Sequence, residues 1–259
     1  MVAFAPDLDE EGRTWAINAL ARKWKKEKRF EEILRGWSNE SYPVYHTVST
    51  TENMDAPSPL AFSIERAALP LFGLPNYGCL LIAYFLSPET DKLMLWVPRR
   101  SITKRTWPGC LDVTVGGGMG TGESARSTII RECAEEASLD PAFVQRNLHS
   151  VGLLSFPNRS PSGWILPGYY HLFELVLPTD GSVQPRTNVA DGEVESFELM
   201  DVDTVIENLY SGTFKPSSAL AMVQFLIRRG IVTETIEPEF TRVRAEMNRQ
   251  VYPYYTSPP

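Results

Sequence analysis

The sequence predicts an α/β protein in which helices cover a mixed β-sheet. Two observations indicate this class. First, apolar runs of strand length, such as 78–86, alternate along the chain with segments whose apolar residues recur at helical spacing. Second, one helical segment, 125–137, follows a predicted strand after a glycine-rich turn. The 259 residues can also bury a substantial core, which allows one large domain or two small ones.

The N-terminal part predicts a short series of mixed elements. Apolar residues at helical spacing, interrupted by a basic run, predict two short helices within 13–37, and aromatic and turn residues predict a bent strand in 37–45. A loop rich in Thr, Ser, Asn and Pro follows at 47–59. The segment 62–69 is predicted to form a helix that ends before Pro70, because proline disfavours a helical residue before it.

The rest of the chain continues the alternation of strands and helices. Strands are expected at 78–86, 93–98, 111–115, 150–156, 169–177 and 193–199, with a loop at 158–167. Helices are expected at 125–137 and 141–147, from an Asp201 or Asp203 cap to 210, from a Ser217 or Ser218 cap to 230, and from Pro238 onward. We divide the chain into a small N-terminal α/β accessory region (1–75), a main domain (76–250) and a loose tail (251–259).

Composition excludes several classes of protein. The formal charge of −7 disfavours a general electrostatic grip on nucleic acid. The sequence contains no apolar run long enough to span a membrane, and the acidic N-terminus differs from a basic targeting peptide, so we expect a cytoplasmic protein. Three widely spaced cysteines, Cys79, Cys110 and Cys133, suggest reduced and mostly buried thiols. A homodimer is one oligomeric state that the sequence leaves open.

Three glutamates on one helix suggest a metal site. Glu132, Glu135 and Glu136 share one face of the predicted helix 125–137, where their charges repel unless a cation lies between them. Oxygen ligands in this number suit Mg²⁺ or Mn²⁺ better than zinc. The alternative is an ordinary solvated helix face. Glu193, on a later strand, could supply a fourth ligand or a base, or could lie on an exposed strand face.

A basic loop lies directly upstream of the predicted strand 111–115, which leads into the glycine turn and this helix. Four basic residues lie within 99–105, namely Arg99, Arg100, Lys104 and Arg105. Cations beside a metal site would offset the charge of a diphosphate substrate, which makes Arg100 and Lys104 candidates for substrate binding. Trp107, between Thr106 and Pro108, could stack on a heterocycle or a cation, or could simply close a turn.

The stretch from Gly117 to Leu139, GGMGTGESARSTIIRECAEEASL, resembles the Nudix box, the signature of enzymes that hydrolyse a diphosphate linked to another group. A glycine, a glutamate, an Arg-Glu pair and two adjacent glutamates stand at the spacing of that box. One position departs from it, because Ser138 replaces the glycine that follows the helix. A positive φ at this cap costs serine about 1 kcal/mol, so the departure affects the cap and none of the presumed ligands.

The resemblance to the Nudix box implies an α/β/α sandwich and assigns roles to individual residues. It implies that Glu132, Glu135 and Glu136 bind divalent metal ions beside the first glycine of the box, with one glutamate as a general base. It also implies that Glu123 and Arg131 form a pair that orients the loop and the helix. The site residues expected from the box are therefore Gly117, Glu123, Arg131, Glu132, Glu135 and Glu136.

Stretches outside the box resemble one Nudix branch, which is related to thiamine pyrophosphokinase and carries a domain of unknown function before the hydrolase. They are WSNESYPVY, FSIERAALPLFG, LWVPRRSITKRTWPGCLDVTVGGGMGTGES, DGEVESFELM and FKPSSALAMVQFLIRRGIV. This resemblance implies hydrolysis of thiamine diphosphate, or of its oxidised analogues, to the monophosphate and phosphate. Two alternatives stay open: a diphosphatase for oxidised nucleotides of the 8-oxo-dGDP type, and a non-enzymatic module that binds a small diphosphate.

Overall fold

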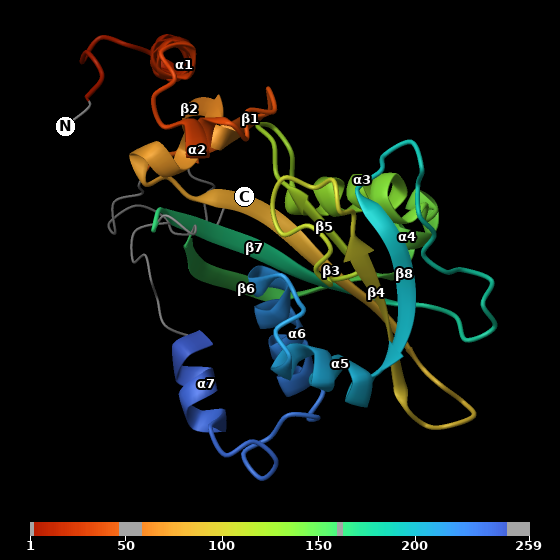
Figure 1. Cartoon of the computed structure of the whole chain (residues 1–259). Helices are drawn as coiled ribbons and strands as arrows, with labels where there is room; N and C mark the ends of the chain where they lie inside the picture. The colour runs from red at the N-terminus through yellow and green to blue at the C-terminus, as the bar shows by residue number, and fades with distance from the viewer. Residues whose placement is uncertain (1–2, 47–58, 160–162, 248–259) are drawn as a thin grey trace.

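A central mixed β-sheet lies between two layers of helices in the computed structural model, which describes residues 3–46, 59–159 and 163–247 (Figure 1). The strand order is β6-β7-β3-β4-β8, and β5 pairs with β3 beside β4. β3 runs parallel to β7, and the other pairs of the sheet are antiparallel. The strands are β3 (Asn76–Leu86), β4 (Leu93–Arg100), β5 (Val115–Gly118), β6 (Leu148–Arg159), β7 (Ile165–Val176) and β8 (Val194–Asp201). The predicted α/β fold with a mixed sheet is confirmed.

The central strand β3 is apolar throughout because helices cover both of its faces. Cys79 and Leu81 face the layer of α3 (Ala125–Ala137) and α4 (Pro141–Asn147). Leu80 and Ile82 face the opposite layer, formed by α5 (Val202–Tyr210) and α6 (Pro216–Arg228). A last helix, α7 (Phe240–Met247), lies beyond α6 (Figure 1).

Helix α3 has the boundaries and the buried stripe that the sequence predicts. The Ser124 hydroxyl accepts a hydrogen bond from the Ser127 amide at its start, and Ser138 adopts a left-handed φ of 53° at its end. Ile129 and Cys133 are completely buried on the inner side. There, the Cys79 thiol donates to the carbonyl oxygen of Ala125 at 3.2 Å, so the helix rests directly on β3.

The N-terminal region forms a smaller unit with its own core. It comprises α1 (Glu10–Lys26), α2 (Glu31–Leu34), the antiparallel pair β1 (Ser41–Tyr45) and β2 (Leu60–Glu65), and the 3-10 helix η1 (Arg66–Phe72). The helix predicted for 62–69 is wrong. Its first half pairs with β1 as a strand, and Pro70 lies inside η1. A short apolar run does not distinguish strand from helix, and the pairing with β1 decided the outcome.

The strand predicted for 111–115 is also wrong, since regular pairing begins only at Val115. Upstream of it, Leu111 makes only isolated bridges, to Arg99 and Phe214, and side chains supply further bonds. The Thr114 hydroxyl donates to the carbonyl oxygen of Trp96 at 2.6 Å and accepts from the Ala83 amide at 2.8 Å. Asp112 accepts from the amide of Val113 at 2.8 Å. The Thr114 bonds tie the segment to the sheet, and the Asp112 bond is local.

Smaller differences concern the ends of elements. The loop expected at 158–167 is shorter, because β6 and β7 extend into it. Helix α6 is preceded by Lys215, whose side chain makes no capping bond, and Ser217 and Ser218 lie within its first turn. The predicted tail and most of the 47–59 loop lie outside the described residues. Within the residues that the structure covers, no helix is long and apolar enough to cross a membrane.

Candidate active site

The segment 116–122, called the glycine segment below, lies against the side of α3 that carries Glu132 and Glu136. The amide of Gly116 donates to Glu136 Oε2 at 3.2 Å. A Cβ atom on Gly117 would overlap the carboxylate of Glu132, so this position requires glycine. The predicted association of Gly117 with the glutamates therefore has a steric reason, because Glu132 occupies the space where a side chain would stand.

Arg131 joins the glycine segment to the helix. Its guanidinium donates to Glu123 Oε1 at 3.0 Å, to Glu132 Oε1 at 3.0 Å and to Glu135 Oε2 at 2.7 Å. Glu123 also accepts from the amide of Gly120 at 3.0 Å. Burial would raise the pKa of Glu123, but the bonds from Arg131 and Gly120 lower it below its ordinary value. Glu123 is thus a fixed anion that holds both the loop and the arginine.

Three carboxylates, Glu132, Glu136 and Glu193, form what we call the acidic cluster. Burial raises the pKa of Glu132 to about 7 despite the opposing charge of Arg131. Burial and the charge of Glu132 raise the pKa of Glu136 well above its ordinary value. Glu136 is 9 % exposed, so its charge has little water to stabilise it. The surroundings of Glu132 and Glu136 therefore stabilise their negative charge poorly.

The donor chemistry of this cluster fits a hard divalent cation. Only carboxylate oxygens are offered, and a cation would relieve the repulsion that raises both pKa values. Across the described residues, no three acidic, histidine or cysteine side chains already form a ready-made metal site. Arg131 holds Glu132 and Glu135 on its own side, and the Glu135 side chain is 50 % exposed. Metal binding by Glu132, Glu135 and Glu136 stays a prediction.

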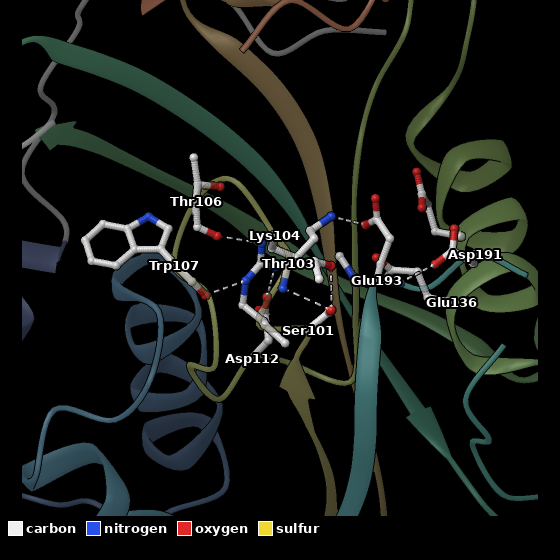
Figure 2. A network of polar contacts seen from close by, with 12 residues as sticks. Ser101, Thr103, Lys104, Thr106, Trp107, Asp112, Glu136, Asp191 and Glu193 are labelled. Carbon is white, nitrogen blue, oxygen red and sulfur yellow. Dashed lines mark hydrogen bonds and ion pairs between the residues drawn. The ribbon is translucent and has the colours of Figure 1, made fainter. Parts of the chain in front are cut away.

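The basic loop (residues 99–109) meets the acidic cluster at Glu193. Lys104 forms an ion pair with Glu193, and the amide of Ser101 donates to the Glu193 carbonyl oxygen at 2.9 Å. Figure 2 shows Lys104 reaching across to Glu193, with Glu136 on the α3 side of the same cluster. Burial would raise the pKa of Glu193, but Lys104 lowers it. Two predicted substrate residues, Lys104 and Glu193, are therefore brought together at the candidate site.

Arg100 lies deeper and has a different environment. Its guanidinium donates to Asp112 Oδ2 at 2.7 Å and to the carbonyl oxygens of Trp107 and Thr106, both at 3.0 Å. Only 13 % of its side chain is exposed. Arg100 thus fixes the backbone of the basic loop. The predicted contact of Arg100 with substrate stays a prediction.

Asp112 is the centre of a buried network that sequence reasoning missed. Besides Arg100, its carboxylate contacts Lys215 Nζ at 3.4 Å and accepts a short hydrogen bond from the Ser218 hydroxyl. Burial would raise its pKa, but Lys215 and Arg100 lower it. The only sequence signal was a single aspartate in an apolar segment. Its partner Ser218 lies more than a hundred positions away, so no local pattern identifies the network.

Trp107, the predicted stacking residue, lies away from the acidic cluster, and Trp164 contacts the N-terminal region. Trp107 has a left-handed φ of 53°, and its ring points away from Glu193 and Glu136 (Figure 2). Trp164 packs edge-on against Phe30 of the N-terminal region, with ring centroids 6.1 Å apart. Trp107 therefore closes a turn in this conformation, and stacking on a substrate stays a prediction.

Two family models match the sequence. The model described as NUDIX domain matches residues 81–220, and the model described as domain of unknown function DUF4743 matches residues 1–76. The division at residue 75 that we expect from the sequence stays a prediction.

Several curated proteins are similar in sequence. A Saccharomyces cerevisiae protein named Uncharacterized protein YJR142W is 33% identical over 253 residues, which are 94% of this chain and 70% of that protein. Nudix hydrolase 20, chloroplastic, from Arabidopsis thaliana is 34% identical over 77% of this chain and 50% of its own length. Nudix hydrolase 24, chloroplastic, from the same plant is 34% identical over 77% of this chain and 51% of its own length. The chain thus spans about half the length of the two plant relatives.

Solved structures are similar at lower identity. The crystal structure of DR0079 from Deinococcus radiodurans is 18% identical, with a TM-score of 0.44, and the match covers 71% of this chain and 98% of that one.

Replacing Asp112 by Asn should destabilise the fold. The substitution leaves Arg100 and Lys215 buried without a counter-charge, which costs about 3 kcal/mol in free energy of unfolding. Urea unfolding followed by circular dichroism measures this loss. The matched control is Asp203→Asn, since that side chain is 72% exposed in its ion pair with Lys92 and should change the unfolding midpoint little. Equal midpoints for both variants would contradict the assigned role.

Replacing Gly117 by Ala should displace Glu132. The added methyl group overlaps the Glu132 carboxylate, and displacement of a site group by 1 Å can lower turnover about 100-fold. Steady-state kinetics measures the loss. Gly36→Ala is the control, because its Cβ would meet its nearest neighbours at 3.5 and 3.9 Å, which is ordinary contact. Full activity of the Gly117 variant would show that Glu132 is not needed where it lies.

The stabilisation of the protein by Mg²⁺ should grow with pH. The folded-state pKa of Glu132 is about 7 against an ordinary 4.5, so the metal-free fold loses stability as pH rises through that window and Glu132 ionises. A bound cation offsets the same charge. Melting temperatures with and without Mg²⁺, at constant ionic strength, should therefore diverge from pH 5 to pH 8. Glu132→Gln should reduce the divergence, and a gap independent of pH would refute this account.

Proposed function

The chain belongs to the Nudix family of hydrolases, and from this premise we propose that it hydrolyses a small diphosphate with the help of a divalent metal ion. Nudix hydrolases generally use Mg²⁺ or Mn²⁺. The observation that carries the proposal is the acidic cluster itself. Glu132 and Glu136 are buried carboxyls whose negative charge is poorly stabilised, and they lie beside the ion pair of Glu193 with Lys104, which is the alternation of charge that a metal-bound diphosphate needs.

Each residue of the site has a role in this reaction. Glu132, Glu135 and Glu136 would hold the cation, which when bound would activate a water molecule and stabilise the leaving phosphate. Lys104 would turn from Glu193 toward the phosphate charge. A carboxylate of the acidic cluster accepts the proton of the attacking water while the phosphoric anhydride bond breaks. Glu123 and Arg131 keep the glycine segment and the helix in register throughout.

We infer that the substrate is thiamine diphosphate or an oxidised analogue. The resemblance of residues 37–249 to the branch related to thiamine pyrophosphokinase supports this choice. The same acidic cluster would serve a nucleoside diphosphate equally well, since it addresses the phosphates and not the heterocycle.

Replacing Glu136 by Gln should abolish turnover and leave the fold intact. Gln has nearly the same shape as Glu but no charge, so the cluster loses a ligand while packing is preserved. Phosphate release with Mg²⁺ should fall by at least about 100-fold, with an unchanged circular dichroism spectrum. Glu195→Gln is a matched control, because Glu195 is exposed on β8 and outside the cluster. Undiminished turnover in the Glu136 variant would remove the mechanism.

A substrate panel tests the heterocycle. Purified protein with Mg²⁺ is assayed for phosphate release from thiamine diphosphate, its oxidised analogues, 8-oxo-dGDP and unmodified nucleoside diphosphates. We expect the highest kcat/KM with a thiamine compound. Faster hydrolysis of 8-oxo-dGDP would show that the substrate is an oxidised nucleotide and not a thiamine compound. Binding of diphosphates without any hydrolysis would show that the protein is a non-enzymatic binding module.

A further inference from the structure

The glycine segment is held from two opposite sides. Helix α3 holds one side, through the Gly116 amide on Glu136 and the close approach of Glu132 to Gly117. The N-terminal region holds the other side, through the β1–β2 hairpin. The contacts on this second side involve residues that no sequence motif connects with the acidic cluster.

Thr121 is the residue of the glycine segment that meets the hairpin. Its amide donates to the carbonyl oxygen of Ser41 at 2.9 Å, and its hydroxyl lies 3.0 Å from Ser63 Oγ and 3.2 Å from the same Ser41 oxygen. Thr121 lies two positions before Glu123, which in turn anchors Arg131. A shift of this turn would therefore be transmitted to the arginine that holds Glu132 and Glu135.

Tyr42 makes the second contact. It lies on β1, is 2 % exposed, and its hydroxyl sits where a Cβ on Gly118 would be. Burial raises its pKa to about 12, so the phenol stays neutral at physiological pH, next to the guanidinium of Arg66. The phenol thus fills the space behind the glycine segment and limits its movement away from α3.

Hydrogen bonds from helix α1 fix the backbone of the β1–β2 hairpin. Asn18 of α1 donates to the carbonyl oxygen of Ser63 at 2.9 Å and accepts from the amide of Glu65 at 2.9 Å. The amide of Ser63 donates to the Thr14 hydroxyl at 3.0 Å. Both partners of Thr121 therefore belong to a unit whose backbone is fixed by helix α1.

We propose that the β1–β2 hairpin of the N-terminal region is a structural part of the active site, with Thr121 and Tyr42 as positioning residues for the acidic cluster. The inference rests on the proposed hydrolysis and deepens it. The hairpin fixes the glycine segment, and the glycine segment fixes Glu132, Glu136 and Arg131. In this proposal, the part of the chain matched by the domain of unknown function holds the glycine segment against α3.

The first test replaces Thr121 by Val in the full chain. Val has a similar shape but lacks the hydroxyl, so the hydroxyl bonds to Ser41 and Ser63 are lost while the amide bond to Ser41 remains. We expect kcat to fall roughly tenfold with KM within about twofold of the wild type, because the cluster is displaced while substrate contacts remain. Hydrogen exchange of the amides in 116–122 should accelerate while exchange in α1 stays unchanged. Thr121→Ser, which restores the hydroxyl, should recover most of the lost kcat.

The control is Thr241→Val. Thr241 lies on α7, at the other end of the molecule (Figure 1), and its hydroxyl is bonded to Glu234. This substitution should change neither kcat nor exchange of the glycine segment. Unchanged kcat and unchanged exchange in the Thr121 variant would overturn the proposal. If the wild type hydrolyses no diphosphate, the proposed function fails, and the exchange measurement still decides whether the hairpin holds the glycine segment.

The second test uses the contact between the two units directly. Gly118→Ala places a methyl group on the Tyr42 hydroxyl and should lower kcat. Adding Tyr42→Leu removes the hydroxyl and should restore part of that kcat, although Tyr42→Leu alone weakens the hairpin. A double variant no more active than Gly118→Ala would overturn the role of Tyr42. If Gly118→Ala does not fold, the Thr121 measurements decide.

Discussion

The buried carboxylate of Asp112 is the interaction on which the geometry of the site depends. It binds Arg100 at the end of β4 and both Lys215 and Ser218 at the start of α6, so one anion joins its own segment to β4 and to a helix more than a hundred positions away. Arg100 in turn fixes two carbonyl oxygens of the basic loop. A buried ion pair is seldom a large source of net stability, because desolvation offsets the attraction. Here it defines where the loop that carries Lys104 can lie.

The site shows how charge is distributed between fixed and adaptable groups. Asp112 and Glu123 are stabilised anions with lowered pKa values, and both organise backbone. Glu132 and Glu136 have raised pKa values, and burial is the main cause. The first pair is satisfied within the protein, whereas the second pair gains most from an added cation. The surroundings thus raise the pKa values of Glu132 and Glu136, which lie one turn apart on α3, and lower the pKa of Glu123.

Sequence reasoning succeeded where the determinants are local. The inner stripe of α3 and the left-handed Ser138 follow from spacing and propensity. It failed where a partner lies far along the chain. The segment 62–65 became a strand because β1 pairs with it, and 111–114 left the ladder because Thr114 bonds Trp96 and Ala83. The same limit applies to the candidate site, where Lys104 and Glu193 were proposed separately and only the fold shows that they meet.

The thiols of Cys79 on β3 and Cys133 on α3 are buried between the helix and the sheet. Burial, together with the charges of Glu132 and Glu123, raises the pKa of Cys79 to about 12, and burial raises that of Cys133 as well. Reaction with alkylating agents and peroxides proceeds through the thiolate, so both sulfurs are inert while the helix stays in place. Lifting of α3 from β3 would expose them. The rate at which the two thiols are labelled would therefore measure how often α3 detaches from β3.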